Sequence, residues 1–310
     1  MAWIAAAHAA HDGGIMIITV TGSTGTIGSE LVRLLSAAGA STRAVYRSAA
    51  KVQPLPGIAW LQADLRDERL LEPAIAGTTR LFLLGDNQRG FADLQIGMIQ
   101  AAASLGVRHI VKLSALGASH HSKSWIALEH RRVEDALEQS SVSWTILRPH
   151  AFMQNWLGDV AESVRTRDTI ESPVADGRVP FIDTLDIAAV AAEVLLRPEA
   201  HLGRKYILTG GEAVGFRELA ASITKVTGRT ISYHALTMEQ ARARLQARGV
   251  PPDQIDAQLA IAAYQKAGGP TSVVSGDVEQ ILGRAPRTID EFVADHARAF
   301  DRLITPGPTA

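Results

Sequence analysis

Three glycines at three-residue spacing, Gly22, Gly25 and Gly28, form the first pattern in the chain that could do chemistry. They follow the apolar, β-branched run at 15–21 and precede an amphipathic helical pattern at 29–38. Glycines in such a turn let the backbone approach a ligand closely and let the helix pack against the strand. The start of a helix also offers unpaired N–H groups and the positive end of the helix dipole. The spacing therefore predicts a site for the pyrophosphate of a dinucleotide, and the alternative is a bare strand–helix turn.

The second predicted strand bears on which dinucleotide binds. Folds that prefer NAD usually place an acidic residue at the end of this strand, where it bonds the ribose 2′-hydroxyl. Here the strand is followed by Arg47, with Lys51 nearby and no carboxylate. An arginine can hold a 2′-phosphate through two hydrogen bonds, so we expect NADP(H) to be favoured over NAD(H). The alternative is that Arg47 is a solvated surface residue.

Further candidates lie where the next strands end, because ligands of open α/β sheets bind at that edge. Asp64 could bond an adenine amino group, cap the helix predicted at 65–76, or do both. Ser114 could serve the cofactor or be an ordinary strand-end hydroxyl. The residues expected to bind the cofactor are Gly22, Ser23, Thr24, Gly25, Thr26, Ile27, Gly28, Arg47, Lys51, Asp64, Leu65, Gly85, Asp86, Asn87 and Ser114.

His130 is the candidate catalytic residue, on a helix predicted at 125–139. Near a nicotinamide, it could donate a proton or a hydrogen bond to a reduced quinone-like oxygen, and we then expect it to be open to the pocket. The alternative is a structural bond to a ribose hydroxyl or to a neighbouring backbone group. The same helix has no tyrosine and no lysine, which disfavours tyrosine-dependent carbonyl reduction. The residues expected to bind substrate are Ala115, His150, Phe152, Asn155 and Trp156, although Phe and Trp are more often core residues.

Composition narrows the class of protein. The chain has 310 residues, of which 46% are apolar and 20% charged, an ordinary globular balance. The formal net charge of −1 gives no electrostatic case for nucleic acid. Without cysteine there is no disulfide and no thiol nucleophile, and no histidine spacing completes a metal site. We expect a cytoplasmic monomer or homodimer that acts on a small molecule, with no membrane partner.

Strand and helix patterns alternate through the first half of the chain, which predicts a parallel sheet with helices on both faces. Besides the first strand, strands are predicted at 41–46, 58–63, 80–84, 109–114, 143–147 and 205–209. Besides the first helix, helices are predicted at 65–76, 91–105, 125–139, 151–164, 187–196, 216–226, 238–248, 252–266 and 289–300. The helix at 187–196 is expected to be capped by Asp186, and 170–180 is expected to be a loop.

The predicted fold class is α/β: a Rossmann-like, doubly wound parallel sheet with a smaller, mostly helical C-terminal substrate lobe. Residues 15–150 are expected to form the NAD(P)-binding core, and 181–211 to return to it. The lobe is expected to comprise 151–180 and 212–310. Residues 1–14 are expected to be a disordered leader.

Several motifs in this order are also typical of a known family. They are the glycine turn, Arg47, His130 with Glu134, the run Trp144-Thr-Ile-Leu-Arg-Pro149, and the run Phe152-Met-Gln-Asn155. Together they resemble the NmrA-like branch of the atypical short-chain dehydrogenase/reductases, over about residues 16–300.

The resemblance implies an NAD(P)H-dependent reductase that transfers hydride to a quinone-like or other conjugated acceptor. Quinone oxidoreductases and triphenylmethane-dye reductases belong to this branch, and many of them have a histidine where this chain has His130. The branch also contains redox sensors that are not enzymes. The alternative function is therefore an NADP(H)-binding regulator that has no turnover.

Overall fold

The computed structural model describes residues 16–302, so the leader expected at 1–14 lies outside the described residues. The chain divides into two compact units. Unit 1 comprises the described residues up to Pro149, together with Thr184–Leu208 and Asp277–Gly283. Unit 2 comprises His150–Asp183, Thr209–Gly276 and the described residues from Arg284 onward. Within residues 16–302, no helix combines the length and the apolar character needed to cross a membrane.

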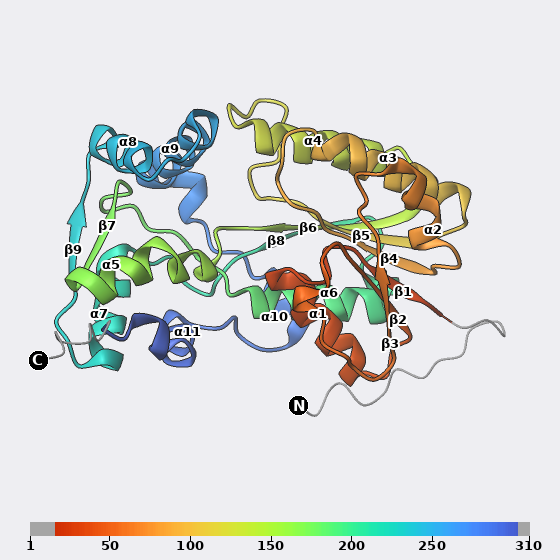
Figure 1. The fold of residues 1–310 in the computed structure, drawn as a ribbon, viewed down its shortest axis with the longest axis horizontal. Coiled ribbons are helices and arrows are strands. Elements are labelled where there is room, and N and C mark those ends of the chain that lie inside the picture. The colour runs from red at the N-terminus through yellow and green to blue at the C-terminus, as the bar shows by residue number, and fades with distance from the viewer. Residues whose placement is uncertain (1–15, 303–310) are drawn as a thin grey trace, which may run out of the picture. The chain divides into compact units, whose positions relative to one another are not determined.

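Unit 1 is built on a sheet of seven parallel strands in the order β3-β2-β1-β4-β5-β6-β8 (Figure 1). The strands are β1 (Ile18–Val20), β2 (Thr42–Tyr46), β3 (Ile58–Gln62), β4 (Arg80–Leu83), β5 (His109–Leu113), β6 (Ser143–Pro149) and β8 (Arg204–Leu208). The first strand pairs with β2 on one side and β4 on the other, so the strand order reverses at β1. Ligands of such sheets bind at the carboxyl edge beside this reversal, which is where the glycine turn begins.

Helices cover both faces of the sheet. They are α1 (Thr26–Ala37), α2 (Leu71–Ile75), α3 (Phe91–Ser104), α4 (Trp125–Glu138), α6 (Thr184–Leu196) and α10 (Asp277–Leu282), with short 3₁₀ turns η1 (Ala49–Lys51), η2 (Glu68–Leu70) and η4 (Pro198–Ala200). Helix α1 packs against α6, while α3 packs against α2 and α4 on the opposite face (Figure 1). The reason is the apolar stripe of each helix, for example Leu31 and Leu35 of α1, which are fully buried.

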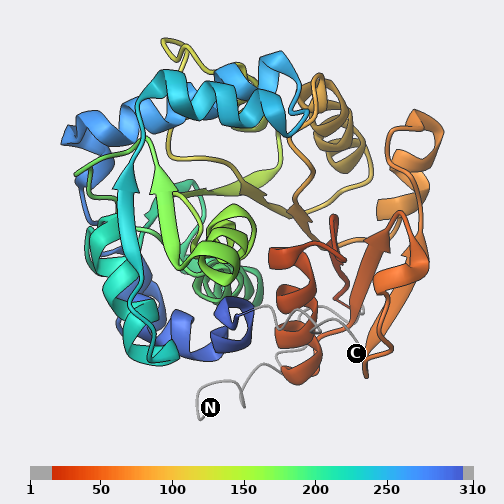
Figure 2. The same ribbon diagram turned by 60° about the vertical axis from the view of Figure 1, so that its left-hand side comes forward.

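Unit 2 is mostly helical and contains a two-stranded parallel sheet. Strands β7 (Thr169–Ser172) and β9 (Ser232–Ala235) pair side by side (Figure 2). The helices are α5 (Asp159–Arg167), α7 (Phe216–Thr227), α8 (Met238–Ala247), α9 (Pro252–Ala267) and α11 (Ile289–Asp295), with 3₁₀ turns η3 (Met153–Leu157), η5 (Gly269–Ser272) and η6 (Ala297–Phe300). Aromatic rings form the centre of this unit, which has its own hydrophobic core.

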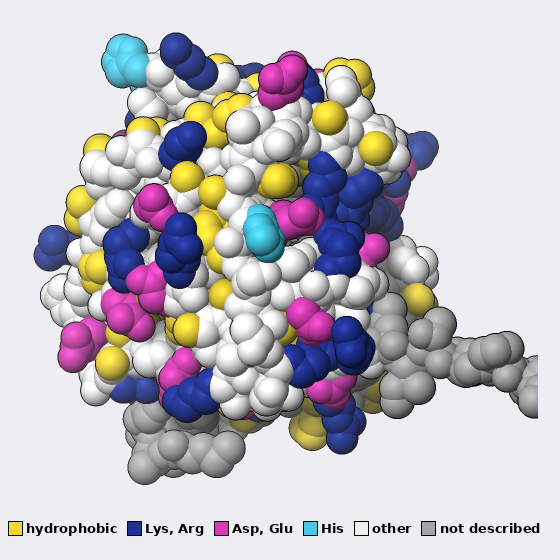
Figure 3. Space-filling view, turned by 90° about the vertical axis from the view of Figure 1, so that its left-hand side faces the viewer, with side chains coloured by type: hydrophobic (Ala, Val, Ile, Leu, Met, Phe, Trp, Pro, Cys, Tyr) yellow, Lys and Arg dark blue, Asp and Glu magenta, His cyan; other side chains and the backbone are white. Residues whose placement is uncertain are grey.

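The surface charges are largely paired. Figure 3, which shows the left-hand side of Figure 1, displays Lys and Arg side chains interspersed with Asp and Glu. In unit 2, for example, Arg242 lies 2.8 Å from Asp256, and Arg248 forms an ion pair with Asp159. Such exposed pairs contribute little to stability individually.

Six of the predicted core strands are confirmed to within one or two residues, and the first, expected over 15–21, is the shorter β1. Several other expectations are wrong. The helix predicted at 65–76 splits into η2 and α2, and the one at 151–164 splits into η3 and α5 around Gly158. The loop predicted at 170–180 contains most of β7, and 289–300 forms α11 and then η6. Helix α6 begins at Thr184, so Asp186 lies buried inside its first turn and is not its cap. Strand β9 and helix α10 were not predicted, and α10 belongs to unit 1.

Candidate cofactor and catalytic site

The glycine turn connects β1 to α1 through a tight backbone approach. Gly22 has φ +61°, a left-handed conformation that side chains rarely adopt. A Cβ atom at Gly28 would lie 2.1 Å from the carbonyl oxygen of Gly22, closer than any real contact. Gly28 is therefore required by the packing of the helix onto the turn. At Gly25 the nearest atom to a Cβ would be the same oxygen at 3.3 Å, and this residue is exposed.

The start of α1 is open to an anion. Gly25 is the N-cap residue and offers no capping side chain, and the first helical bond runs from Ser29 N to Gly25 O at 2.9 Å. The N–H groups of Thr26, Ile27 and Gly28 precede that bond, so the helix itself supplies no acceptor for them. The side chain of Ile27 is buried, so only its backbone can serve a ligand. The exposed Gly25, the free N–H groups and the helix dipole fit a pyrophosphate.

Two hydroxyl groups fix the turn against the neighbouring strands. Thr21 Oγ1 donates to Leu84 O at 2.7 Å and accepts the N–H of Leu84 at 2.9 Å, which joins the end of β1 to the end of β4. Ser23 Oγ donates to Val45 O of β2 at 2.7 Å, and Ser23 is fully buried. The hydroxyl of Ser23 thus supports the turn, and Thr24 beside it is half-buried.

The residues expected to read the ribose lie at the carboxyl end of β2. Arg47 is exposed, and its Nη1 lies 3.7 Å from Asp86 Oδ2 in the loop after β4. Both side chains are more than half exposed, at 56% and 58%, so the pair is weak and Arg47 can turn to a phosphate at little cost. Lys51, the last residue of η1, is also exposed.

Asp64 follows β3 and is engaged by its own loop. Arg66 donates Nε to Asp64 Oδ1 at 2.9 Å and its backbone N–H to the same oxygen at 3.2 Å. These hydrogen bonds from Arg66 hold the pKa of the Asp64 carboxyl at about 2. The cap of η2 is Asp67, which accepts from Arg69 N, so the predicted capping role of Asp64 is wrong. Leu65 packs, half-buried, against the core of unit 1.

A buried glutamine lies beside the loop after β4. Gly85, Asp86 and Asn87 of this loop are exposed, as a cofactor-binding edge requires. A Cβ at Gly85 would approach Gln95 Nε2 of α3 to 3.1 Å. The side chain of Gln95 is buried, and its carboxamide oxygen has no hydrogen-bond partner within the described residues. Gln95 could not be singled out from the sequence, because a single glutamine in an amphipathic helix is ordinary.

A buried charge cluster joins β5, α4 and β6. Glu134 is fully buried and accepts Ser114 Oγ at 2.5 Å and Arg148 Nε at 2.9 Å, with a further bond from Arg131 Nη1 at 3.0 Å. Two guanidinium groups and a hydroxyl compensate the buried carboxylate, which would otherwise be costly. The hydroxyl of Ser114 thus donates to Glu134, which agrees with the alternative that it is an ordinary strand-end hydroxyl.

His130 lies one helical turn before Glu134 and is also buried. Its exposed fraction is 5%, so His130 is much less open than expected, and only a small part of the side chain can meet a ligand. The ring packs 4.8 Å from that of Phe91, centroid to centroid, and its Nδ1 lies 3.4 Å from Lys112 Nζ. Burial, together with the nearby lysine, lowers the pKa of His130 to about 2. The imidazole is therefore neutral at physiological pH.

Lys112 is the functional candidate that sequence reasoning missed. It lies on β5 and is fully buried, and its ammonium donates to Leu113 O as well as facing His130. Burial lowers the pKa of Lys112 to about 7, although the charge of Glu134 acts in the opposite direction. Lysine is almost never fully buried. Only the alternation of side chains along β5 hinted that Lys112 and Ser114 share one face of the sheet.

Comparison with known proteins identifies the family. The sequence profile of the NmrA-like family matches residues 16–293. The chain belongs to the NmrA-like family. It is 34% identical over 289 residues to the NAD(P)H azoreductase of Xenophilus azovorans, across 92% of this chain and 99% of that protein.

Solved structures of other proteins share the fold. The NADPH-dependent quinone oxidoreductase of Escherichia coli in complex with NADPH is 29% identical, with a TM-score of 0.81 over 90% of this chain and 99% of that one. The triphenylmethane reductase of Citrobacter sp. in complex with NADP(H) is 22% identical, with a TM-score of 0.80 over 91% and 100%. At that identity the second likeness shows the fold alone. The Rossmann-like fold class is thereby confirmed.

In this NmrA-like protein, both ring nitrogens of His150 are occupied within unit 2. Nδ1 accepts the N–H of Ala151 at 2.6 Å, so the ring proton is on Nε2, which donates to Thr271 O at 3.0 Å. Burial lowers the pKa of His150 to about 4. The imidazole thus connects the start of unit 2 to η5, and neither nitrogen is free for a substrate.

The other expected substrate residues are in different surroundings. Trp156 is 2% exposed, and its ring centroid lies 4.7 Å from that of Phe181. It is therefore a core residue, the alternative to substrate binding. Phe152 is half-buried beside Ile182, and Asn155 is exposed. Ala115 is half-buried in unit 1, whereas the other four residues belong to unit 2.

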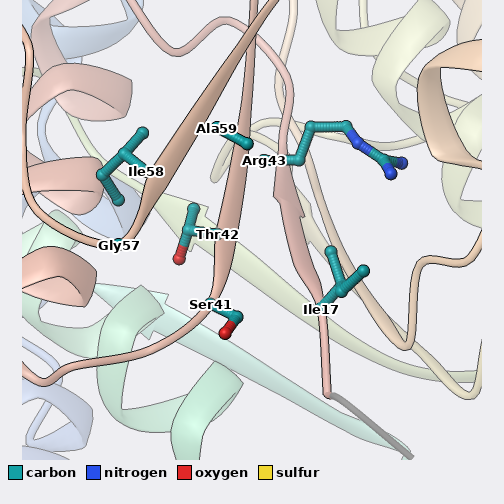
Figure 4. A pocket seen from close by; sticks show the side chains of 7 residues that line it. All are labelled: Ile17, Ser41, Thr42, Arg43, Gly57, Ile58 and Ala59. Carbon is teal, nitrogen blue, oxygen red and sulfur yellow. The ribbon is translucent and has the colours of Figure 1, made fainter.

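A groove of about 410 Å³ lies at the amino edge of the sheet, opposite the edge at which ligands of such sheets bind. It is lined by Ile17, Ser41, Thr42, Arg43, Gly57, Ile58 and Ala59 (Figure 4). Arg43 is its one ionisable side chain, and Figure 4 shows it leading away from Ser41 and Thr42. Its Nη1 donates to Ala76 O at 2.8 Å, where it caps the end of α2. No group of three or more His, Asp or Glu side chains within residues 16–302 forms a metal site.

Proposed function

We propose that this NmrA-like protein is an NAD(P)H-dependent reductase that transfers hydride to a quinone-like or other conjugated small molecule. The observation that carries the proposal is the uncapped start of α1, framed by Gly22, Gly25 and Gly28 at the switch point of the sheet. Relatives at about 30% identity, the azoreductase and the quinone oxidoreductase named above, support the reaction class. A bound NAD(P)H would supply the hydride from its nicotinamide ring.

The chain's own residues would mainly bind and orient. The backbone N–H groups at the start of α1 would hold the pyrophosphate, and Arg47 would hold a 2′-phosphate. We propose on this basis that NADP(H) is favoured over NAD(H). Conjugated acceptors such as quinones take up hydride without a strong acid, so the absence of tyrosine from α4 is no obstacle.

The test is NADPH oxidation, followed at about 340 nm, with a panel of quinones, azo dyes, triphenylmethane dyes and enones. We expect turnover with at least one class, and no turnover in a folded Gly25→Val variant. Tight NADPH binding without turnover on the whole panel would contradict the enzyme and favour the alternative, a redox sensor. That sensor would bind NADP(H) and report the redox state to another protein.

A further inference from the structure

The buried pair Lys112 and His130 has a defined hydrogen-bond direction. Below about pH 7, where Lys112 is an ammonium group, its nitrogen carries only donors, so Nδ1 of His130, which faces Lys112 Nζ at 3.4 Å, is the acceptor. In the neutral ring the proton must then be on Nε2. Within residues 16–302, no side chain or carbonyl accepts a hydrogen bond from Nε2. His130 is thus held as a donor whose N–H has no protein acceptor.

The position of this N–H group is set by α3 and α4. The ring of His130 packs on Phe91, the first residue of α3, and Glu129 accepts the N–H of Ala92 at 3.2 Å. Helix α3 begins directly after the exposed loop that holds Asp86 and Asn87. His130 therefore lies next to the carboxyl edge of the sheet, the edge at which the cofactor is proposed to bind.

The surrounding charges keep the exchangeable proton on lysine. Burial lowers the pKa of His130, and the second buried cation that its protonation would create beside Lys112 lowers it further. On α4, Glu134 is the carboxylate that favours the ammonium form of Lys112. The charges of Arg131 on α4, Arg148 on β6 and Lys205 on β8 are directed at the same carboxylate. His130 can therefore transfer a proton through its ring, but it does not remain as an imidazolium cation.

We propose that Lys112 is a positioning residue that fixes His130 as an Nε2–H donor and replaces the proton that His130 gives to the reduced acceptor. The inference rests on the proposed function. The hydride brings two electrons and one proton to the acceptor, whose oxygen becomes negative. The Nε2–H bond breaks and an O–H bond forms, while Nδ1 takes a proton from Lys112 Nζ. The products are a neutral imidazole of the other tautomer and a neutral amine. The resting state returns when Nε2 takes a proton from solvent and Nδ1 gives its proton back to the Lys112 amine.

The first test is NMR of ¹⁵N-histidine-labelled protein without cofactor or acceptor, with His130 assigned from a His130→Gln variant. In the wild type, we expect Nε2 protonated and Nδ1 unprotonated. In Lys112→Met, where the donor is lost, we expect the Nδ1–H tautomer to become populated. In this variant Glu134 keeps its hydrogen bonds to Arg131 and Arg148, so the substitution leaves no buried carboxylate unpaired, and thermal unfolding checks that the protein stays folded. Identical His130 tautomers in wild type and Lys112→Met would overturn the positioning role.

The second test is the pH profile of kcat. A proton supplied by Lys112 makes kcat fall as the pH rises through about 7, because the amine is then neutral. Lys112→Met should lower kcat about 10²-fold and remove this pH dependence, with KM for NADPH unchanged. His130→Gln, which keeps an N–H donor but cannot relay a proton, should show the same loss of kcat and of its pH dependence. Lys123→Met, at an exposed lysine before α4, is the control and should match the wild type.

The outcomes separate the two proposals. An unchanged pH profile in a folded, active Lys112→Met protein overturns the proton-supply role and leaves the reductase intact. Absence of turnover in the wild type with every acceptor overturns the reductase and the proton-supply role with it. The NMR result needs neither cofactor nor acceptor, so it decides the positioning of His130 in either case.

Discussion

At the scale of single residues, Gly25 and Gly28 lie in one turn but meet different neighbours. A Cβ at Gly28 would collide with the carbonyl of Gly22 at 2.1 Å, whereas a Cβ at Gly25 would meet only the same oxygen, at a tight but less severe 3.3 Å. We therefore expect Gly25→Val to stay folded and to lose NADPH binding, because the side chain occupies the space of the pyrophosphate. Gly28→Val should also lower the thermal stability. Titration calorimetry and thermal unfolding of both variants check this.

A folded Gly25→Val protein with wild-type NADPH affinity would show that the dinucleotide does not bind at this turn. The two variants together distinguish the ligand site from the packing of the turn, which a single substitution would confuse.

If the 2′-phosphate binds at the end of β2, Arg47 determines the preference for NADPH over NADH. A charge-assisted hydrogen bond to phosphate is worth about 1.5–3 kcal/mol, so Arg47→Ala should weaken NADPH binding about ten- to hundredfold and NADH binding much less. Arg69→Ala, at an exposed arginine paired with Asp67, is the matched control. Dissociation constants for both cofactors give the measurement. Equal losses for NADPH and NADH would mean that Arg47 does not contact the 2′-phosphate.

The sequence indicated those residues whose role depends on local chain geometry. Gly22 and Gly28 could be predicted because a turn between strand and helix needs them, wherever the rest of the chain lies. The burial of Lys112 and His130 could not, because it depends on α3 and α4 packing over β5, and a lysine in isolation reads as a surface residue. The same packing makes Ser114 a partner of Glu134.

At the scale of elements, α4 is joined to β5 and β6 through Glu134. Glu134→Gln would leave Arg148 and Arg131 facing a neutral amide, and breaking a buried ion pair typically costs about 3–5 kcal/mol. We expect a loss of unfolding free energy of about this size, measured by chemical denaturation. Glu138→Gln, at a more exposed glutamate of the same helix, should cost less than about 1 kcal/mol. A similar loss for both variants would contradict a special role for the buried carboxylate.

The elements that were predicted correctly have strong apolar patterns. The core strands are short β-branched runs between turn residues, and α6 is apolar on nearly every side because it is buried. The missed strands are polar in sequence: β7 reads Thr-Ile-Glu-Ser and β9 reads Ser-Tyr-His-Ala, so neither has an apolar pattern that would predict a strand, although Ile170 and Ser172 of β7 are buried. Their pairing unites segments about 60 residues apart, which no local pattern encodes. The break at Gly158 likewise interrupts a run with helical propensity.

At the scale of the whole molecule, the chain passes between its two units more than once. Helix α6 and strand β8 return to unit 1 after the first part of unit 2, and α10 returns again. The return of Thr184–Leu208, expected over 181–211, could be anticipated from its strongly apolar helix and the strand that follows it. The return of α10 could not, because Asp277 anchors it by accepting the N–H of Ile207 at 2.7 Å, a contact between residues 70 positions apart.

Acid stability should be set by buried neutral histidines. Thr145 Oγ1 donates to His201 O at 2.7 Å, so His109 Nε2 must donate to Thr145 Oγ1, at 2.9 Å. Protonation would add a proton to His109 Nδ1, which is buried with no partner in the described part of the chain. Burial, with Arg80 nearby, accordingly lowers the pKa of His109 to about 4.

The sign of the effect follows from the lowered pKa. Between pH 6.5 and about 4 the unfolded chain binds a proton at His109 that the folded protein does not, so stability is lost as the pH falls through this window. The slope is about 1.4 kcal/mol per pH unit for each such histidine. His109→Gln, which keeps a donor near Thr145, should reduce the pH dependence of the unfolding free energy by one such slope, measured by denaturation between pH 7 and 5. His121→Gln, on an exposed loop, should leave the slope unchanged, and equal slopes in all three proteins would show that His109 does not govern acid stability.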